Sequence, residues 1–250
     1  MEFPPITILI VTFNRLGLLK KTVEALVDNI DYPQDKLYWL LADDCSEPGY
    51  TDKIKKWPIW KGKNLAFSVT ETNKGWGANV NQALDAVQTD FVFQIEDDYI
   101  LSKKLDLKEG IALLLADEKV GYIRYRGHSG KGDMWYLQDE ADISKFYPEY
   151  KQAENYPGVV QYLLLNCGSP SVYIYTHGAH LKHKKFHAFY GKYFEHLKLG
   201  LCEERYAIKV KEMMPEKSAP RLVILVDWIP MWFIHTGESY QNTAWDKDRS

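Results

Sequence analysis

Residues 1–120 alternate between the pattern of a buried strand and the pattern of an amphipathic helix. Continuous apolar runs predict strands at Ile6–Thr12, Leu37–Asp43, Leu65–Glu71 and Phe91–Ile95. Apolar residues three and four positions apart predict the helices between them, around Leu18–Val27, Tyr50–Trp57 and Val80–Val87. Strands that alternate with helices are typical of a mostly parallel sheet that helices cover on both faces. The pattern therefore predicts an α/β fold.

After residue 125 the pattern is looser. The glycine-rich stretch Arg126–Trp135 predicts a loop, and Cys202–Met213 has the spacing of a helix. Apolar runs predict three further strands, at Val172–Tyr175, Leu222–Val226 and Met231–His235. No repeat, low-complexity tract or clear linker interrupts the sequence. We therefore expect a single domain over residues 1–250.

The strand predicted at Phe91–Ile95 runs directly into three acidic residues, Glu96, Asp97 and Asp98. Adjacent carboxylates repel one another and gain nothing from the core, so we expect a cation beside them. A divalent metal ion with oxygen ligands is the usual partner of such a group. The alternative is an acidic turn covered by solvent.

Polar side chains follow each of the four strands predicted in the first half. They are Asn14 and Arg15, Asp43 and Asp44, Asn73 and Lys74, and Glu96 to Asp98. In an open α/β sheet, ligands bind beyond the carboxyl ends of the strands. The sequence therefore places a ligand site at one edge of the sheet.

Composition narrows the class of protein. Hydrophobic residues make up 46% of the chain and charged residues 26%, as in ordinary globular proteins, and a net charge of −3 gives no basic footprint for nucleic acid. Cys45, Cys167 and Cys202 have no CxxC spacing and cannot all pair, which favours a reducing compartment. No apolar run approaches the roughly 20 residues that span a bilayer. The first strand is predicted to begin at Ile6, so we expect no signal peptide. We expect a cytoplasmic protein.

Four short motifs carry a resemblance to a known family. They are TFNR (Thr12–Arg15), DDCS (Asp43–Ser46), NKGWGANVNQAL (Asn73–Leu84) and EDDYIL (Glu96–Leu101). In order and spacing they resemble family 2 glycosyltransferases of the GT-A fold, across roughly residues 1–105. The resemblance implies a Rossmann-like, mixed and mostly parallel sheet flanked by helices. It also implies that residues 1–105 bind a nucleotide-sugar and residues 106–250 face the acceptor.

The resemblance assigns donor-binding residues. Asp44, the second acid of its pair, is expected to accept the N3–H of uracil or thymine, a proton that cytosine lacks; the alternative is an acidic turn or helix cap. Gly75 and Gly77 would allow close backbone approach to the ribose and sugar, or form a plain helix-entry turn. With Val80 where a third glycine would stand, the loop does not match a dinucleotide-binding motif. The expected nucleotide-sugar-binding residues are Thr12, Phe13, Asn14, Arg15, Asp44, Asn73, Lys74, Gly75 and Asp97.

The family pattern places the metal ligand at Asp98, with Asp97 facing the ribose or donor sugar. His235 ends an apolar strand, and several GT-A enzymes bring a C-terminal histidine to the metal; the alternative is a histidine hydrogen-bonded at a strand end. An imidazole ligand would shift the preference from Mg²⁺ toward Mn²⁺. The metal would neutralise charge on the departing diphosphate.

Glu203 and Glu204 are expected to open a helix whose inner face carries Tyr206, Val210 and Met213. The family places its catalytic base at the start of such a helix, and the register of Lys209 favours Glu203. A helix N-terminus stabilises an ionised carboxylate, which can then accept a proton. The alternative is compensation of the helix dipole. In a retaining GT-A transferase Glu203 would be structural, and an inactive nucleotide-sugar-binding module would need no base.

The stretch His177–His187 holds four histidines and three lysines. On a helix its ends would lie about 15 Å apart, too far for one zinc ion to bind all four. We expect a solvated face, or a basic surface that meets an anionic acceptor or a membrane. The expected partners are a UDP-sugar, with a dTDP-sugar as the alternative, and a saccharide, lipid-linked or protein acceptor; peripheral membrane contact is left open.

Overall fold

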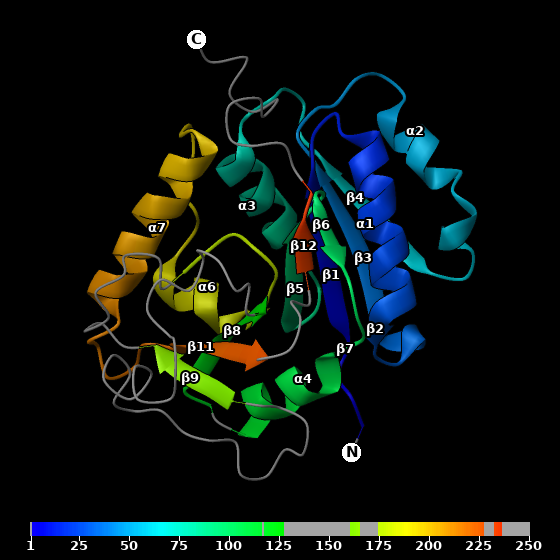
Figure 1. Ribbon diagram of the computed structural model, residues 1–250. Coiled ribbons are helices and arrows are strands. Elements are labelled where there is room, and N and C mark those ends of the chain that lie inside the picture. Colours follow the sequence, from blue (N-terminus) through cyan, green and yellow to red (C-terminus); the bar gives the residue numbers. More distant parts are fainter. Residues whose placement is uncertain (1, 117, 128–160, 166–174, 228–232, 237–250) are drawn as a thin grey trace.

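The computed structural model describes residues 2–116, 118–127, 161–165, 175–227 and 233–236. Its centre is an eight-stranded sheet (Figure 1). From one edge to the other the strands are β4 (Asn64–Val69), β3 (Leu37–Asp43), β1 (Ile6–Thr12), β5 (Phe91–Glu96), β10 (His180–His183), β8 (Val120–Gly127), β11 (Arg221–Asp227) and β9 (Gln161–Leu165). Strand β10 is antiparallel to both its neighbours and β9 is antiparallel to β11, whereas the other four pairings are parallel. The predicted mixed, mostly parallel sheet is therefore confirmed.

Helices cover both faces of this sheet. On one face lie α1 (Leu16–Asn29), α2 (Tyr50–Lys55) and α4 (Leu107–Ala116), and on the other lie α3 (Trp76–Ala86), α6 (Lys185–Tyr190) and α7 (Leu199–Met213). Two turns of 3₁₀ helix occur at Gln34–Lys36 and Pro58–Trp60. Among the described residues, no helix is both long enough and apolar enough to span a bilayer.

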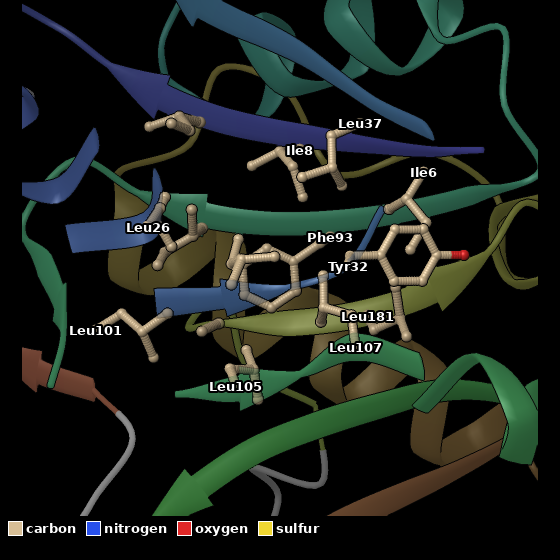
Figure 2. Close-up of a cluster of buried hydrophobic side chains, with 14 of the residues drawn as sticks. Ile6, Ile8, Leu26, Tyr32, Leu37, Phe93, Leu101, Leu105, Leu107 and Leu181 are labelled. Carbon is tan, nitrogen blue, oxygen red and sulfur yellow. The ribbon is translucent and has the colours of Figure 1, made fainter. Parts of the chain in front are cut away.

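Successive side chains of β1 and β5 point to opposite faces of the sheet and enter two separate cores. Ile6, Ile8 and Phe93 belong to the core beneath α1 and α4, which Figure 2 shows. Leu9 and Val92 belong to the core beneath α3 and α7. Both faces of these strands are therefore buried, which explains why their sequences are continuous apolar runs rather than alternating ones.

Four short strands form two small ladders beside the main sheet. In one, β2 (Ile30–Asp31) pairs with β7 (Leu105–Asp106). In the other, β12 (Phe233–His235) pairs antiparallel with β6 (Tyr99–Leu101), just after the acidic turn that ends β5. This second ladder brings the C-terminal part of the described chain to the functional edge of the sheet (Figure 1).

Most predicted elements are confirmed. The strands at Ile6–Thr12 and Leu37–Asp43 have the predicted bounds. The loop predicted at Arg126–Trp135 is wrong at its first two residues, which end β8; its remainder lies outside the described residues, as do residues 172–174 of a predicted strand.

The surface expected over His177–His187 is wrong for the first half of this stretch, although the Lys184 side chain is 66% exposed. His180 and Lys182 are 0% and 1% exposed, because β10 lies inside the sheet between β5 and β8. His177, just before β10, is 2% exposed. Lys182 is buried with polar partners: its Nζ donates to Gln94 Oε1 at 2.6 Å and to the Tyr193 hydroxyl at 3.1 Å. Hydrogen-bond acceptors from other parts of the chain therefore allow a strand with basic residues to lie inside the sheet.

Candidate active site

The ends of β1 and β3 are tied together by Asn14 and Ser46. The Asn14 amide donates to Ser46 Oγ at 2.7 Å, and the Glu47 amide donates to Asn14 Oδ1 at 2.8 Å. Asn14 has a positive φ of 53°, a conformation that asparagine tolerates better than most residues. Its side chain thus joins two strand ends at the edge where the nucleotide is expected.

Asp44 holds the turn that leads into α3. Its carboxylate is fully buried and accepts bonds from Thr70 Oγ1 at 2.8 Å, the Lys74 amide at 2.9 Å and the Gly75 amide at 2.7 Å. Gly75 has a φ of 85°, which favours glycine. Asp44 therefore fixes the backbone of the predicted donor-binding turn, and its contact with a base stays a prediction.

The acidic turn after β5 has an arginine beside it. Nη1 of Arg15 lies 3.0 Å from Asp97 Oδ1 and 2.7 Å from Asp98 Oδ2, and the two aspartates are 3% and 5% exposed. Thr12 Oγ1 donates to Asp97 Oδ2 at 2.7 Å. Burial raises the pKa of Asp97 to about 7, although the charge of Arg15 opposes this shift. In the structure Arg15 is thus a cation that the clustered acids require.

The backbone at His235 lies next to that of Asp98. His235 pairs with Tyr99 in the β12–β6 ladder, and the amide and hydroxyl of Thr236 donate to the Asp98 carbonyl oxygen at 2.7 and 3.0 Å. Carboxylate oxygen and imidazole nitrogen together suit Mn²⁺, so these two residues fit the expected metal by chemistry and by backbone position. No group of three or more histidine, cysteine, aspartate or glutamate side chains with metal-binding geometry occurs in the described part of the chain.

Glu203 lies further inside its helix than expected. Helix α7 begins at Leu199, and its first turn contains no acidic residue, so the expected placement of Glu203 at the helix start is wrong. Instead the His177 amide donates to Glu203 Oε1 at 2.7 Å. Burial raises the pKa of Glu203, whereas this hydrogen bond and the charge of Arg124 lower it. Glu204, the next residue, is part-buried.

The candidate base and the acidic turn meet at one edge. The pKa of Glu96 is raised well above its usual value, first by burial and then by the charges of Asp98, Glu203 and Asp97. Such mutual influence requires that these carboxylates lie near one another, although the residues come from opposite halves of the sequence. The structure thus places the acid predicted as base near Glu96, the first acid of the EDDYIL motif.

Sequence reasoning missed three contributors to this site. The Thr70 hydroxyl donates a hydrogen bond to Asp44, and the charge of Arg124 lowers the pKa of Glu203. The backbone amide of His177 donates to Glu203, and the His177 ring stacks on Trp76. Thr70 could have been noticed because it lies at a predicted strand end. The other two come from β8 and the segment before β10, whose pairing no local pattern reveals.

Comparison with known proteins shows the family and the fold. Residues 7–174 match the model of Glycosyl transferase family 2. TarS of S. aureus is 20% identical, with a TM-score of 0.63 over 93% of this chain and 37% of that chain. Residues 1–349 of TarS in complex with UDP-GlcNAc are 17% identical, with a TM-score of 0.66 over 97% of this chain and 61% of that one.

A third similar structure is the mannosyltransferase PcManGT from Pyrobaculum calidifontis in complex with GDP-Man and Mn²⁺. It is 15% identical, with a TM-score of 0.62 over 92% of this chain and 58% of that chain. No curated protein matches the chain. The chain spans less than two thirds of the length of each of these structures, and the low identities show a shared fold. Because the family model covers more than half of its residues, the chain belongs to glycosyl transferase family 2.

Proposed function

We propose that this chain is a metal-dependent, inverting glycosyltransferase that moves a sugar from a UDP-sugar to an acceptor hydroxyl. The observation that carries the proposal is that Glu203 lies near Glu96, the first acid of the turn that contains Asp97 and Asp98. In this arrangement residues 1–105 hold the donor and residues 106–250 present the acceptor.

The reaction needs a base on the acceptor side. Glu203, when ionised, accepts the proton of the acceptor hydroxyl, and the freed oxygen pair attacks the anomeric carbon from the face opposite the diphosphate. The bond from that carbon to the diphosphate oxygen breaks, and UDP leaves with the electron pair. The hydrogen bond from the His177 amide favours the ionised carboxylate that this step requires.

Asp98 and His235 would hold the divalent metal. When bound, the ion offsets the charge that develops on the departing diphosphate. Mn²⁺ is the preferred candidate, with Mg²⁺ as the alternative, and PcManGT was solved with Mn²⁺. Arg15 already lies beside Asp97 and Asp98 and would lie near the phosphates of the donor.

The choice of donor rests on Asp44 and the resemblance of its motif to the family. TarS was solved with UDP-GlcNAc and PcManGT with GDP-Man, so neighbours of this fold bind different bases. We propose a UDP-sugar, with a dTDP-sugar as the alternative. The proposed cytoplasmic setting rests on the cysteine spacing; Cys45 and Cys202 are free thiols in the structure.

The test is release of UDP from a panel of UDP-sugars in the presence of Mn²⁺. We expect slow hydrolysis of at least one donor by the parent protein and none by Asp98→Asn. Binding of UDP without any release would instead support an inactive module. With an acceptor in hand, the anomeric configuration of the product separates inversion from retention.

A further inference from the structure

The ring of His177 lies flat on the indole of Trp76. Their centroids are 3.5 Å apart and their planes differ by 14°. Both side chains are 2% exposed. The ring of Tyr193 meets both of them edge-on, with centroids 5.0 Å from Trp76 and 5.5 Å from His177. The imidazole is therefore held between aromatic surfaces on more than one side.

The ring nitrogens of His177 take no part in this arrangement. Neither nitrogen has a hydrogen-bond partner among the described residues. Burial lowers the pKa of His177 well below its usual value, which favours the neutral ring. A neutral ring without polar partners contributes through the contact of its face, as an ordinary aromatic side chain does.

The backbone of His177 has a different task. Its amide donates to Glu203 Oε1 at 2.7 Å. The direction of this donor depends on where the His177 backbone lies, and the stacked ring anchors that backbone. A shift of the ring would therefore move or remove the hydrogen bond that orients Glu203.

Trp76 links the same stack to the donor side. It is the first residue of α3 and directly follows Gly75. The Gly75 amide donates to the buried Asp44 carboxylate at 2.7 Å. Contacts thus run without a break from Asp44 through Gly75, Trp76 and His177 to Glu203.

We propose that Trp76 and His177 form a positioning pair that fixes Glu203 relative to the nucleotide-binding turn. The inference deepens the proposed function and rests on it. Both side chains are buried, and the pair acts through the His177 amide on the orientation of Glu203.

Two substitutions at one position test the pair. His177→Phe keeps a flat ring and loses only nitrogens without partners, so we expect turnover within about twofold of the parent. His177→Leu keeps bulk but cannot stack, and we expect kcat to fall roughly 10- to 100-fold, as for a misplaced catalytic group. The affinity for UDP, measured by calorimetry, should stay near the parent value in both variants. Circular dichroism and thermal unfolding establish that both variants fold.

The pH profile gives a readout that a general structural defect would not move. The hydrogen bond from the His177 amide stabilises ionised Glu203, so loss of this hydrogen bond raises the pKa of the Glu203 carboxyl. The acid limb of the kcat profile should therefore move to higher pH in His177→Leu and stay in place in His177→Phe. In a Glu203→Gln background, His177→Leu should cost no further activity, because the two changes disable one unit.

Several results would overturn the positioning pair. Equal losses in His177→Phe and His177→Leu would show that the ring nitrogens act, and parent-like turnover in His177→Leu would show that stacking is dispensable. The pair would also be overturned if His177→Leu lowered the activity of Glu203→Gln by the same factor by which it lowers the activity of the parent. Failure of the proposed function looks different: the parent protein would release no UDP, or Glu203→Gln would keep full activity, whatever residue stands at position 177.

Discussion

Nη1 of Arg15 lies 2.7 Å from Oδ2 of Asp98, so the predicted metal ligand already carries a counter-charge in the structure. The same nitrogen is 3.0 Å from Asp97. A divalent ion that binds Asp98 must therefore share this carboxylate with Arg15 or displace it. We expect the diphosphate of a bound donor to draw Arg15 away from Asp98, because the diphosphate offers the guanidinium a second anion.

Arg15→Met should strengthen binding of Mn²⁺ in the absence of nucleotide, because the ion no longer competes with a guanidinium for Asp98. A gain of roughly tenfold corresponds to the loss of one charge-assisted hydrogen bond. Electron paramagnetic resonance of free Mn²⁺ measures the affinity directly. Lys20→Met, on an exposed pair with Glu24, is the matched control. An unchanged affinity in Arg15→Met would mean that Asp98 is not where the ion binds.

His235→Ala should weaken Mn²⁺-dependent binding of UDP, while the thermal midpoint without ligands stays near that of the parent. The thermal midpoint should not change because the β12–β6 ladder, which positions His235, is formed by backbone groups that alanine keeps. Calorimetric titration with UDP, with and without Mn²⁺, separates the metal-dependent part. Metal dependence identical to the parent would make His235 an ordinary strand-end histidine.

Glu203→Gln should lower turnover by roughly 10²–10⁴, because glutamine preserves size but accepts no proton. The affinity for UDP should not change, since the nucleotide is expected to be held by Asp44 and the other strand ends rather than by Glu203. Glu204→Gln is the control, and its effect should be far milder. Comparable losses in the two variants would indicate a structural role for this turn of α7. An intact rate in Glu203→Gln would favour Glu204 as base or a retaining mechanism.

UDP with Mn²⁺ should raise the melting temperature much more than CDP, GDP or ADP, because Asp44 is expected to accept the N3–H of uracil. A ligand that binds only the folded state stabilises it by mass action. Thermal-shift measurements at one nucleotide concentration make the comparison. Equal shifts for UDP and CDP would remove the base-reading role from Asp44 and leave its bonds to Thr70, Lys74 and Gly75.

Lys182 predicts an unusual pH dependence of stability. Burial lowers its pKa well below the usual value, so in the alkaline range the unfolded chain binds a proton that the folded chain does not. Stability should therefore rise with pH up to the unfolded pKa near 10.4 and fall as pH decreases, by at most about 1.4 kcal/mol per unit.

Lys182→Met removes the titrating group. The free energy of unfolding of the parent, relative to this variant, should grow between pH 7 and pH 10 in denaturant titrations. Lys184→Met is the control, because the Lys184 side chain is 66% exposed. Parallel curves for parent and Lys182→Met would show that the folded protein keeps Lys182 protonated throughout this range.

The first half of the fold could be predicted because its signals are local. Strands β1 and β3 are buried on both faces, so each is a continuous apolar run that ends in polar residues at the sheet edge. The order of the motifs then placed Asp44 and Asp98 at that edge. Each of these inferences uses only a few consecutive residues and the parallel arrangement of strands.

The second half could not be predicted in the same way. In β10, His180 and Lys182 are buried because side chains from β5, β8 and the Tyr193 segment surround them, and their own sequence is that of a surface. The start of α7 was misplaced because Glu203 looked like a first-turn acid, whereas its partner is the distant His177 amide. Tertiary partners decided both cases, and no periodicity reports them.

The β12–β6 ladder also affects the order in which the site can form. Strands β1, β3, β4 and β5 all lie within the first hundred residues, so their pairing closes shorter loops than the β12–β6 pairing does. The strand containing His235 comes from the far end of the described chain and must wait until the acidic turn exists. During refolding, competence to bind a metal–nucleotide complex should therefore arise after the sheet of the donor half. If the chain has the proposed function, an incompletely folded molecule would not consume its donor before that moment.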